Sequence, residues 1–119
     1  RVDNNDNAEA LNIIGEVSGH TALTVDDEID TGSSLLSTIN TLLQGGVTEV
    51  YACCTHGVLS GGAADKIAAS PLRELVITDT LPSSHKKLNG KVTVLSVAPM
   101  LGEAIHRIHS GLSVGSMFE

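Results

Sequence analysis

The spacing of apolar positions divides the chain into short runs and longer repeats. Apolar runs bounded by polar turns predict strands at residues 21–25, 47–54, 74–78 and 92–97. Apolar residues that recur every three or four positions predict helices at residues 33–44, 63–70 and 99–109. Strands that alternate with helices in this way favour a parallel α/β sheet.

Two of the predicted helices have especially regular apolar faces. In the first, Gly45 and Gly46 follow a face made of Leu35, Leu36, Ile39, Leu42 and Leu43. In the last, Pro99 begins the helix, and its expected buried face consists of Leu101, Ala104, Ile105 and Ile108. The last helix is therefore expected to belong to the core.

The pattern is weaker at the beginning of the chain. Residues 1–7 are polar and predict a loop or a frayed end, and residues 8–17 fit either a short helix or a strand. The strand predicted at residues 21–25 is expected to be buried. Residues 83–90 predict a polar loop, and residues 110–119 predict a tail.

Composition limits the classes of function. The chain has 119 residues, enough for one domain and one core, and its aromatic content of 2% makes that core aliphatic. A net charge of −7 argues against general binding to nucleic acid or to anionic membranes. No apolar run is long enough to span a bilayer, and no secretory leader is recognisable.

The two cysteines also inform the setting. Cys53 and Cys54 are adjacent in a predicted strand, so their side chains point to opposite faces and cannot readily bond to each other. Free thiols without a leader predict a reducing, cytoplasmic environment. The chain starts at Arg1 instead of Met, which indicates a piece of a longer protein.

Candidate chemistry is concentrated where the first strand meets the first long helix. Four carboxylates gather within five positions, at Asp26, Asp27, Glu28 and Asp30. Crowded carboxylates need a metal ion or hydroxyl donors to relieve their repulsion. The next residues, Thr31, Gly32, Ser33 and Ser34, offer N–H groups and hydroxyls at a helix N-terminus, which suits a phosphate. Together they predict a sugar-phosphate pocket.

The acidic stretch also allows two other interpretations. The stretch fits an exposed acidic turn with Asp30 or Thr31 as the helix N-cap. It also has some likeness to the acidic pocket of a response-regulator receiver, but the strand ending at Cys54 lacks the required Asp and the last strand lacks the required Lys. His56 is expected to be a hydrogen-bonded loop residue, and His106 with His109 lacks a third ligand for zinc.

The acidic stretch resembles the phosphoribosyl-pyrophosphate (PRPP) binding motif, which is an apolar run, two acids, a spacer, and then Thr with small or hydroxyl residues. Phosphoribosyltransferases share this motif with ribose-phosphate pyrophosphokinase, also called PRPP synthetase. The second family is the better match, because its C-terminal half also resembles residues 55–61, 76–82, 95–101, 104–109 and 111–118. The resemblance covers the chain from about Asn12 onward and favours a strand at residues 8–17.

The resemblance implies a fold and a site. The fold is a parallel-sheet, Rossmann-like α/β domain of the type I phosphoribosyltransferase class, with residues 1–119 forming one domain, the C-terminal half of a longer enzyme. Asp26 and Asp27 would hold the ribose hydroxyls, directly or through Mg²⁺. The 5-phosphate would be wrapped by Asp30, Thr31, Gly32, Ser33 and Ser34. Here Gly32-Ser33-Ser34 replaces the small-Gly-Thr that is common in bacterial members.

The resemblance also implies a reaction that this chain does not complete. The ribose 1-hydroxyl of ribose 5-phosphate would attack the β-phosphorus of ATP to give PRPP and AMP. ATP would bind mainly through an N-terminal domain, and a mobile basic loop would lie just before Arg1. No catalytic residue is assigned, and the fragment is expected to be inactive alone. The family's tail helps to form an allosteric site between subunits, and the candidate residues here are Ser113, Ser116 and Phe118. Gly115 and Ser116 replace the usual Ser and Tyr of that segment.

Three alternatives stay open at this stage. The chain fits a non-catalytic regulatory subunit that resembles PRPP synthetase, a phosphoribosyltransferase, or a plain sugar-phosphate binding module. A phosphoribosyltransferase should lack the blocks at residues 55–61 and 95–101, which are present here. A homo-oligomer is expected for the full-length enzyme.

Overall fold

The computed structural model describes residues 12–82, 88 and 90–119. In chain order its elements are β1 (Thr21–Ile29), α1 (Ser33–Gln44), β2 (Glu49–Gly57), α2 (Ala63–Ala69), β3 (Glu74–Thr78), β4 (Val92–Leu95), α3 (Ala98–His109) and the 3-10 helix η2 (Gly115–Phe118). The four strands form one parallel sheet in the order β1-β2-β3-β4. The predicted parallel α/β class is therefore confirmed.

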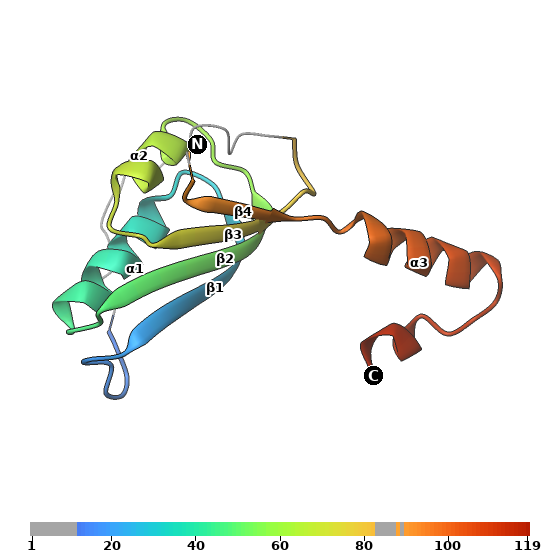
Figure 1. The fold of residues 1–119 in the computed structure, drawn as a ribbon, viewed down its shortest axis with the longest axis horizontal. Coiled ribbons are helices and arrows are strands. Elements are labelled where there is room, and N and C mark those ends of the chain that lie inside the picture. The colour runs from blue at the N-terminus through green and yellow to red at the C-terminus, as the bar shows by residue number, and fades with distance from the viewer. Residues whose placement is uncertain (1–11, 83–87, 89) are drawn as a thin grey trace, which may run out of the picture.

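Helices α1 and α2 cover the same face of this sheet, as Figure 1 shows. Parallel strands are joined by right-handed crossovers, and each new strand here joins on the same side of the previous one. Crossovers that progress in one direction place their helices on one face. The core lies between these helices and the sheet, and its fully buried side chains include Ile39, Ile67, Leu72, Leu75 and Val50.

The opposite face of the sheet, called here the open face, is not covered by any helix in the described part of the chain. Strand β2 shows the difference, because Ala52 and Cys54 are buried whereas Tyr51 and Cys53 are partly exposed. Neighbouring side chains on a strand point to opposite faces. The prediction that the two cysteines lie on opposite faces is confirmed, and both are free thiols.

Strand β1 differs from the prediction in length and in burial. It continues through the acidic residues to Ile29, and two of its apolar side chains, Leu23 and Val25, are 64% and 75% exposed. The expectation of a buried strand was wrong because β1 is an edge of the sheet and these side chains lie on the open face. Asp26, Asp27 and Glu28 are therefore carried by a strand, and only Asp30 lies in the turn that follows.

Helix α3 forms where the sequence predicted it but does not enter the core. None of its residues is buried, and Leu101, Ile105 and Ile108 are all more than half exposed. Figure 1 shows α3 extending away from the sheet beyond the end of β4, with η2 folded back beside it. The expected buried face was wrong because no described part of the chain covers it.

The remaining boundaries follow the pattern closely. The helix at Ser33–Gln44 and the strand at Glu74–Thr78 have the predicted bounds, whereas β2 continues to Gly57 and β4 ends at Leu95. Residues 12–17 form no strand, contrary to the resemblance, and residues 1–11 lie outside the described chain. Most of the predicted loop at residues 83–90 also lies outside it. Within the described residues, no helix combines the length and apolarity that crossing a membrane requires.

Candidate functional site

The junction between β1 and α1 is built around Gly32. Strand β1 ends at Ile29 and α1 begins at Ser33, so three residues make the turn. Gly32 is the N-cap of α1 and has a φ of 80°, a left-handed conformation that glycine adopts without strain. The proposed N-caps, Asp30 and Thr31, were wrong because the left-handed step places the helix start one residue further along.

A cavity of about 340 Å³ opens at this junction. Its lining joins residues of β1 with the first turns of α1: Thr24, Val25, Asp26, Glu28, Ile29, Asp30, Thr31, Gly32, Ser34, Leu35, Thr38 and Cys53. Five of the seven predicted site residues are thus brought together, namely Asp26, Asp30, Thr31, Gly32 and Ser34. Asp27 and Ser33 are not part of the lining.

Two of the three carboxylates on β1, Asp26 and Glu28, line the cavity. Asp26 pairs with Cys54 and Glu28 pairs with His56 in the register with β2, so Asp26 and Glu28 share the face on which α1 begins. Asp27, between them, belongs to the other face. Glu28 was missed as a site residue from the sequence, although a two-residue spacing from Asp26 along a longer strand would have found it.

The carboxylates are held by the backbone that follows each of them. One oxygen of Asp26 accepts a hydrogen bond from the Asp27 N–H at 2.8 Å, and one oxygen of Asp27 accepts from the Glu28 N–H at 2.9 Å. A hydrogen bond with the Asp26 side chain, then the Glu28 N–H and the charge of His56, hold the pKa of Asp27 below its usual value. Asp27 is therefore ionised at neutral pH and accepts hydrogen bonds.

Asp30 has a different part from the other acids. Its carboxylate accepts a hydrogen bond from the Ser60 hydroxyl, and its carbonyl accepts from the Ser60 N–H at 3.0 Å. Leu59, beside Ser60, donates its N–H to the carbonyl of Ile29 at 3.0 Å. These bonds fasten the loop after β2 to the β1–α1 turn. The Asp30 side chain therefore positions the turn.

The N-terminus of α1 is open to a ligand. No side chain caps it, and the first helical hydrogen bond runs from the Leu36 N–H to the Gly32 carbonyl at 2.9 Å. The Thr31 hydroxyl donates to the Ser33 hydroxyl at 3.4 Å. No acidic residue lies in the first turn. An uncapped helix start beside hydroxyl groups binds anions, and phosphate in particular.

A second group of polar residues lies at the carboxyl ends of β2 and β3. His56 Nδ1 is 2.8 Å from the Thr80 hydroxyl oxygen, and the Thr78 hydroxyl donates to the Thr55 carbonyl at 2.6 Å. His56 is thus hydrogen-bonded, as the sequence predicted for a loop residue, although it belongs to the end of β2. In the register of the sheet it lies opposite Glu28, at the acidic end of β1.

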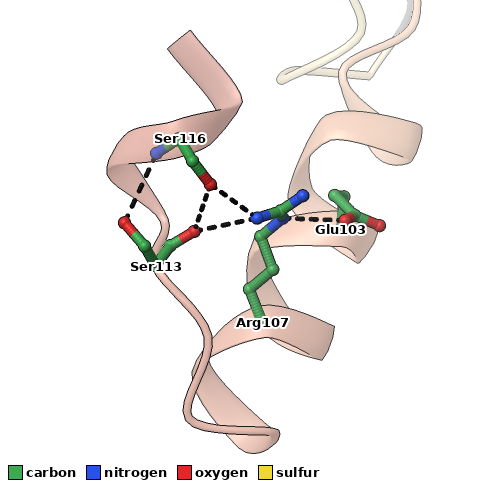
Figure 2. Close-up of polar contacts among 4 residues, drawn as sticks. All are labelled: Glu103, Arg107, Ser113 and Ser116. Atoms are coloured by element: carbon green, nitrogen blue, oxygen red, sulfur yellow. Dashed lines mark hydrogen bonds and ion pairs between the residues drawn. The ribbon is translucent and has the colours of Figure 1, made fainter. Parts of the chain in front are cut away.

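The tail residues predicted for an allosteric role lie on the α3 extension and not at the cavity. Figure 2 shows Arg107 between Glu103 and the tail, where it donates to the Glu103 carboxylate at 2.8 Å and to the Ser116 hydroxyl at 2.7 Å. It also donates to the Ser113 carbonyl at 3.0 Å. Phe118 is 71% exposed. Ser113 and Ser116 therefore fix η2 to α3.

Neither a metal cage nor a catalytic cation is apparent at the cavity. Among the described residues, no group of three or more His, Cys, Asp or Glu side chains is arranged to hold a metal ion. The cavity lining contains carboxylates and hydroxyls but no Lys or Arg from the described chain. Arg73 lies 3.8 Å from Glu49, and Lys91 donates to the Ser70 carbonyl at 2.6 Å.

The chain is similar to ribose-phosphate pyrophosphokinases from several bacteria. The one from Oceanobacillus iheyensis is 50% identical over 112 residues, which are 94% of this chain and 35% of that protein. The one from Caldanaerobacter subterraneus subsp. tengcongensis is 51% identical over 111 residues, 93% of this chain and 35% of that protein. The chain thus spans about a third of the length of these relatives.

A solved structure and a family model agree with these relatives. The phosphoribosylpyrophosphate synthetase from Mycobacterium smegmatis matches with a TM-score of 0.79 and 38% identity over 82% of this chain and 33% of that one. The family model described as phosphoribosyl synthetase-associated domain matches residues 3–119. The chain therefore belongs to the phosphoribosyl synthetase-associated domain family.

Proposed function

We propose that this chain is the ribose 5-phosphate-binding, C-terminal domain of a ribose-phosphate pyrophosphokinase, with the type I phosphoribosyltransferase fold. The observation that carries the proposal is the cavity between β1 and α1, which combines carboxylates with an uncapped helix N-terminus. Carboxylates accept hydrogen bonds from sugar hydroxyls, and helix N–H groups donate to phosphate oxygens. The names of the relatives favour this activity over that of a phosphoribosyltransferase.

Within this site, each group has a distinct part. Asp26 accepts a ribose hydroxyl inside the cavity, and Asp27 supports it from the neighbouring position, where its lowered pKa keeps it charged. The N–H groups and hydroxyls from Thr31 to Ser34 surround the 5-phosphate. Asp30 contributes backbone to this loop, because its carboxylate is already bonded to Ser60.

Magnesium fits this site only as an ion shared with the substrate. Asp26, which lines the cavity, uses one carboxylate oxygen for a backbone N–H, which leaves its other oxygen for a cation. Mg²⁺ prefers one or two carboxylates together with substrate oxygens and water, and this donor set meets that preference. When bound, the ion would offset the negative charge that the carboxylates and the phosphates bring together.

The proposal assigns no catalytic residue to this chain. Transfer of a pyrophosphoryl group needs cationic side chains around the transferred phosphates, and the cavity lining offers none from the described residues. ATP is proposed to bind mainly through a part of the longer protein outside this sequence, in a cytoplasmic homo-oligomer. The chain alone is therefore expected to bind ribose 5-phosphate without forming AMP. An effector site at Ser113, Ser116 and Phe118 stays a prediction.

Isothermal titration of ribose 5-phosphate, with and without Mg²⁺, tests the site. Asp26→Asn and Ser34→Ala are each expected to weaken binding about tenfold or more, because each removes a hydrogen bond to the ligand. The matched controls are Glu49→Gln, at the opposite end of β2, and Ser37→Ala, one turn further along α1. Both should bind as the parent chain does. Equal affinity in the parent chain and all four variants would show that ribose 5-phosphate does not bind at the proposed site.

A further inference from the structure

The loop between β2 and α2, residues 58–62, contacts the β1–α1 turn without lining the cavity. The Leu59 N–H donates to the Ile29 carbonyl at 3.0 Å. The next N–H, that of Ser60, donates to the next carbonyl of the turn, that of Asp30, also at 3.0 Å. Asp30 lines the cavity, whereas none of the loop residues does. The loop therefore lies behind the turn, on the side away from the cavity.

The backbone of Leu59 makes this double contact possible. Its φ is 50°, and within the described part of the chain it is the one residue other than glycine with a positive φ. In this left-handed region a residue directs its own N–H and the following N–H to the same side. The conformation is unfavourable for leucine, but the Leu59 side chain is buried in the core, which holds it there.

The same two bonds set the direction of N–H groups on the other side of the turn. No cis peptide bond occurs among the described residues, and in a planar trans peptide the carbonyl and the following N–H point in opposite directions. The carbonyls of Ile29 and Asp30 point to the loop. The N–H groups of Asp30 and Thr31 therefore point away from it, to the side of the cavity. Successive N–H groups that share a direction form an anion site.

The side chains of Ser60 and Asp30 add an electrostatic contribution. The Ser60 hydroxyl donates to the Asp30 carboxylate, which draws this charge towards the loop behind the turn. A carboxylate that turned towards a bound phosphate would repel it. The cavity lining offers no Lys or Arg from the described chain to offset that repulsion. The direction of the Asp30 carboxylate therefore affects how well the turn binds an anion.

We propose that Ser60 is a positioning residue of the phosphate subsite. Its N–H aims the N–H groups of the turn at the ligand, and its hydroxyl keeps the Asp30 carboxylate away from the ligand. The proposal rests on the proposed function, because the phosphate concerned is the 5-phosphate of ribose 5-phosphate. Ser60 contacts the turn and not the ligand, so its effect on affinity passes through Asp30.

Isothermal titration of ribose 5-phosphate tests the role of the hydroxyl. Ser60→Ala should weaken binding about fivefold or more, because it removes a hydrogen bond to a carboxylate and frees that charge. Ser60→Thr, which keeps a hydroxyl, should restore most of the affinity. Asp30→Asn combined with Ser60→Ala removes the charge and should restore it too. Ser110→Ala, at the C-cap of α3, is the matched control and should bind as the parent chain does. A double variant as weak as Ser60→Ala would overturn the proposal, since a merely structural loss is not repaired by removing the charge.

NMR of the ligand-free chain tests the backbone part separately. A scalar coupling across the hydrogen bond should join the Ser60 amide nitrogen to the Asp30 carbonyl carbon. A parent chain that does not bind ribose 5-phosphate would overturn both this proposal and the proposed function. A parent chain that binds it but lacks this coupling, or binds it no better than Ser60→Ala does, would overturn the role of Ser60 alone.

Discussion

Helices α1 and α3 have the same length and comparable amphipathic patterns, yet only one is packed. Each has 12 residues, but α1 buries Leu35 and Ile39 whereas α3 buries none. Helix α1 joins two parallel strands, so its crossover must lie on the sheet. Helix α3 follows β4, the last strand described, and no later strand draws it back. An apolar stripe thus predicts a contact but not the molecule that supplies it.

The largest expected effect is a difference in the free energy of unfolding between substitutions in α1 and in α3. Ile39→Ala is expected to lower the free energy of unfolding by about 2–5 kcal/mol, because Ile39 is 0% exposed and its loss leaves a cavity. Ile105→Ala should change it by less than about 0.5 kcal/mol in the monomer. Urea unfolding followed by circular dichroism, at a concentration that keeps the chain monomeric, measures both. Similar losses would show that α3 packs on its own chain.

A smaller effect, on the pH dependence of stability, should distinguish the covered face of the sheet from the open face. Burial raises the pKa of the Cys54 thiol to about 11 on the covered face. The unfolded thiol titrates lower, near 9, so the folded state binds the proton more tightly. This contribution to stability is therefore present below pH 9 and is lost as the pH rises towards 11.

Unfolding experiments across this pH range would measure the effect of Cys54. Cys54→Ala should be less stable overall but should lose the part of the pH dependence that belongs to this thiol. Cys53→Ala, its neighbour on the open face, is the matched control and should keep the parent's pH dependence. A stability profile that is the same in all three proteins would contradict the assignment of Cys54 to the covered face.

Two glycines near the cavity should respond to alanine with opposite signs. Gly32→Ala is expected to cost about 1–2 kcal/mol, because φ is 80° there while the nearest side-chain atom lies at an ordinary 3.6 Å. Gly62→Ala, with a φ of −88° and open space around it, should stabilise the chain by up to about 1 kcal/mol. Thermal unfolding compares them, and equal shifts would show that Gly32 is not held in this conformation.

The smallest effect concerns Ser96 and Val97, the two residues that link β4 to α3. Hydrogen bonds from the Ser96 side chain and the Val97 N–H lower the pKa of Asp79. The ionised carboxylate therefore holds the link at neutral pH, and this contribution is lost as the pH falls through the lowered pKa of Asp79. Backbone ¹⁵N relaxation should show a more mobile α3 only at low pH. In Asp79→Asn the mobility of α3 should not change with pH. If the mobility of α3 in the parent chain is also independent of pH, Asp79 does not have this role.

Sequence reasoning succeeded where the signal is local and failed where it depends on a neighbour. The bounds of α1 follow from its own spacing and from Gly45, and those of β3 from its apolar run. The exposure of Val25 and Ile105 depends on what lies across the sheet, which no local pattern records. The acidic stretch was predicted as a site and a cavity lies beside it, but the sequence did not show that β1 runs through the acids, so Glu28, which lines the cavity, was not among the predicted residues.

Backbone NMR during a titration with ribose 5-phosphate tests the central claim most directly, because it reports on both regions at once. The account predicts saturable shifts of the amide signals of Asp26, Gly32, Ser33 and Ser34. The signals of Arg107 in α3 and Ser116 in η2 should not change. Ribose alone and inorganic phosphate alone should each shift fewer of the site signals, and only at higher concentration. Shifts confined to α3 and η2, or no saturable shift at the β1–α1 junction, would contradict the account.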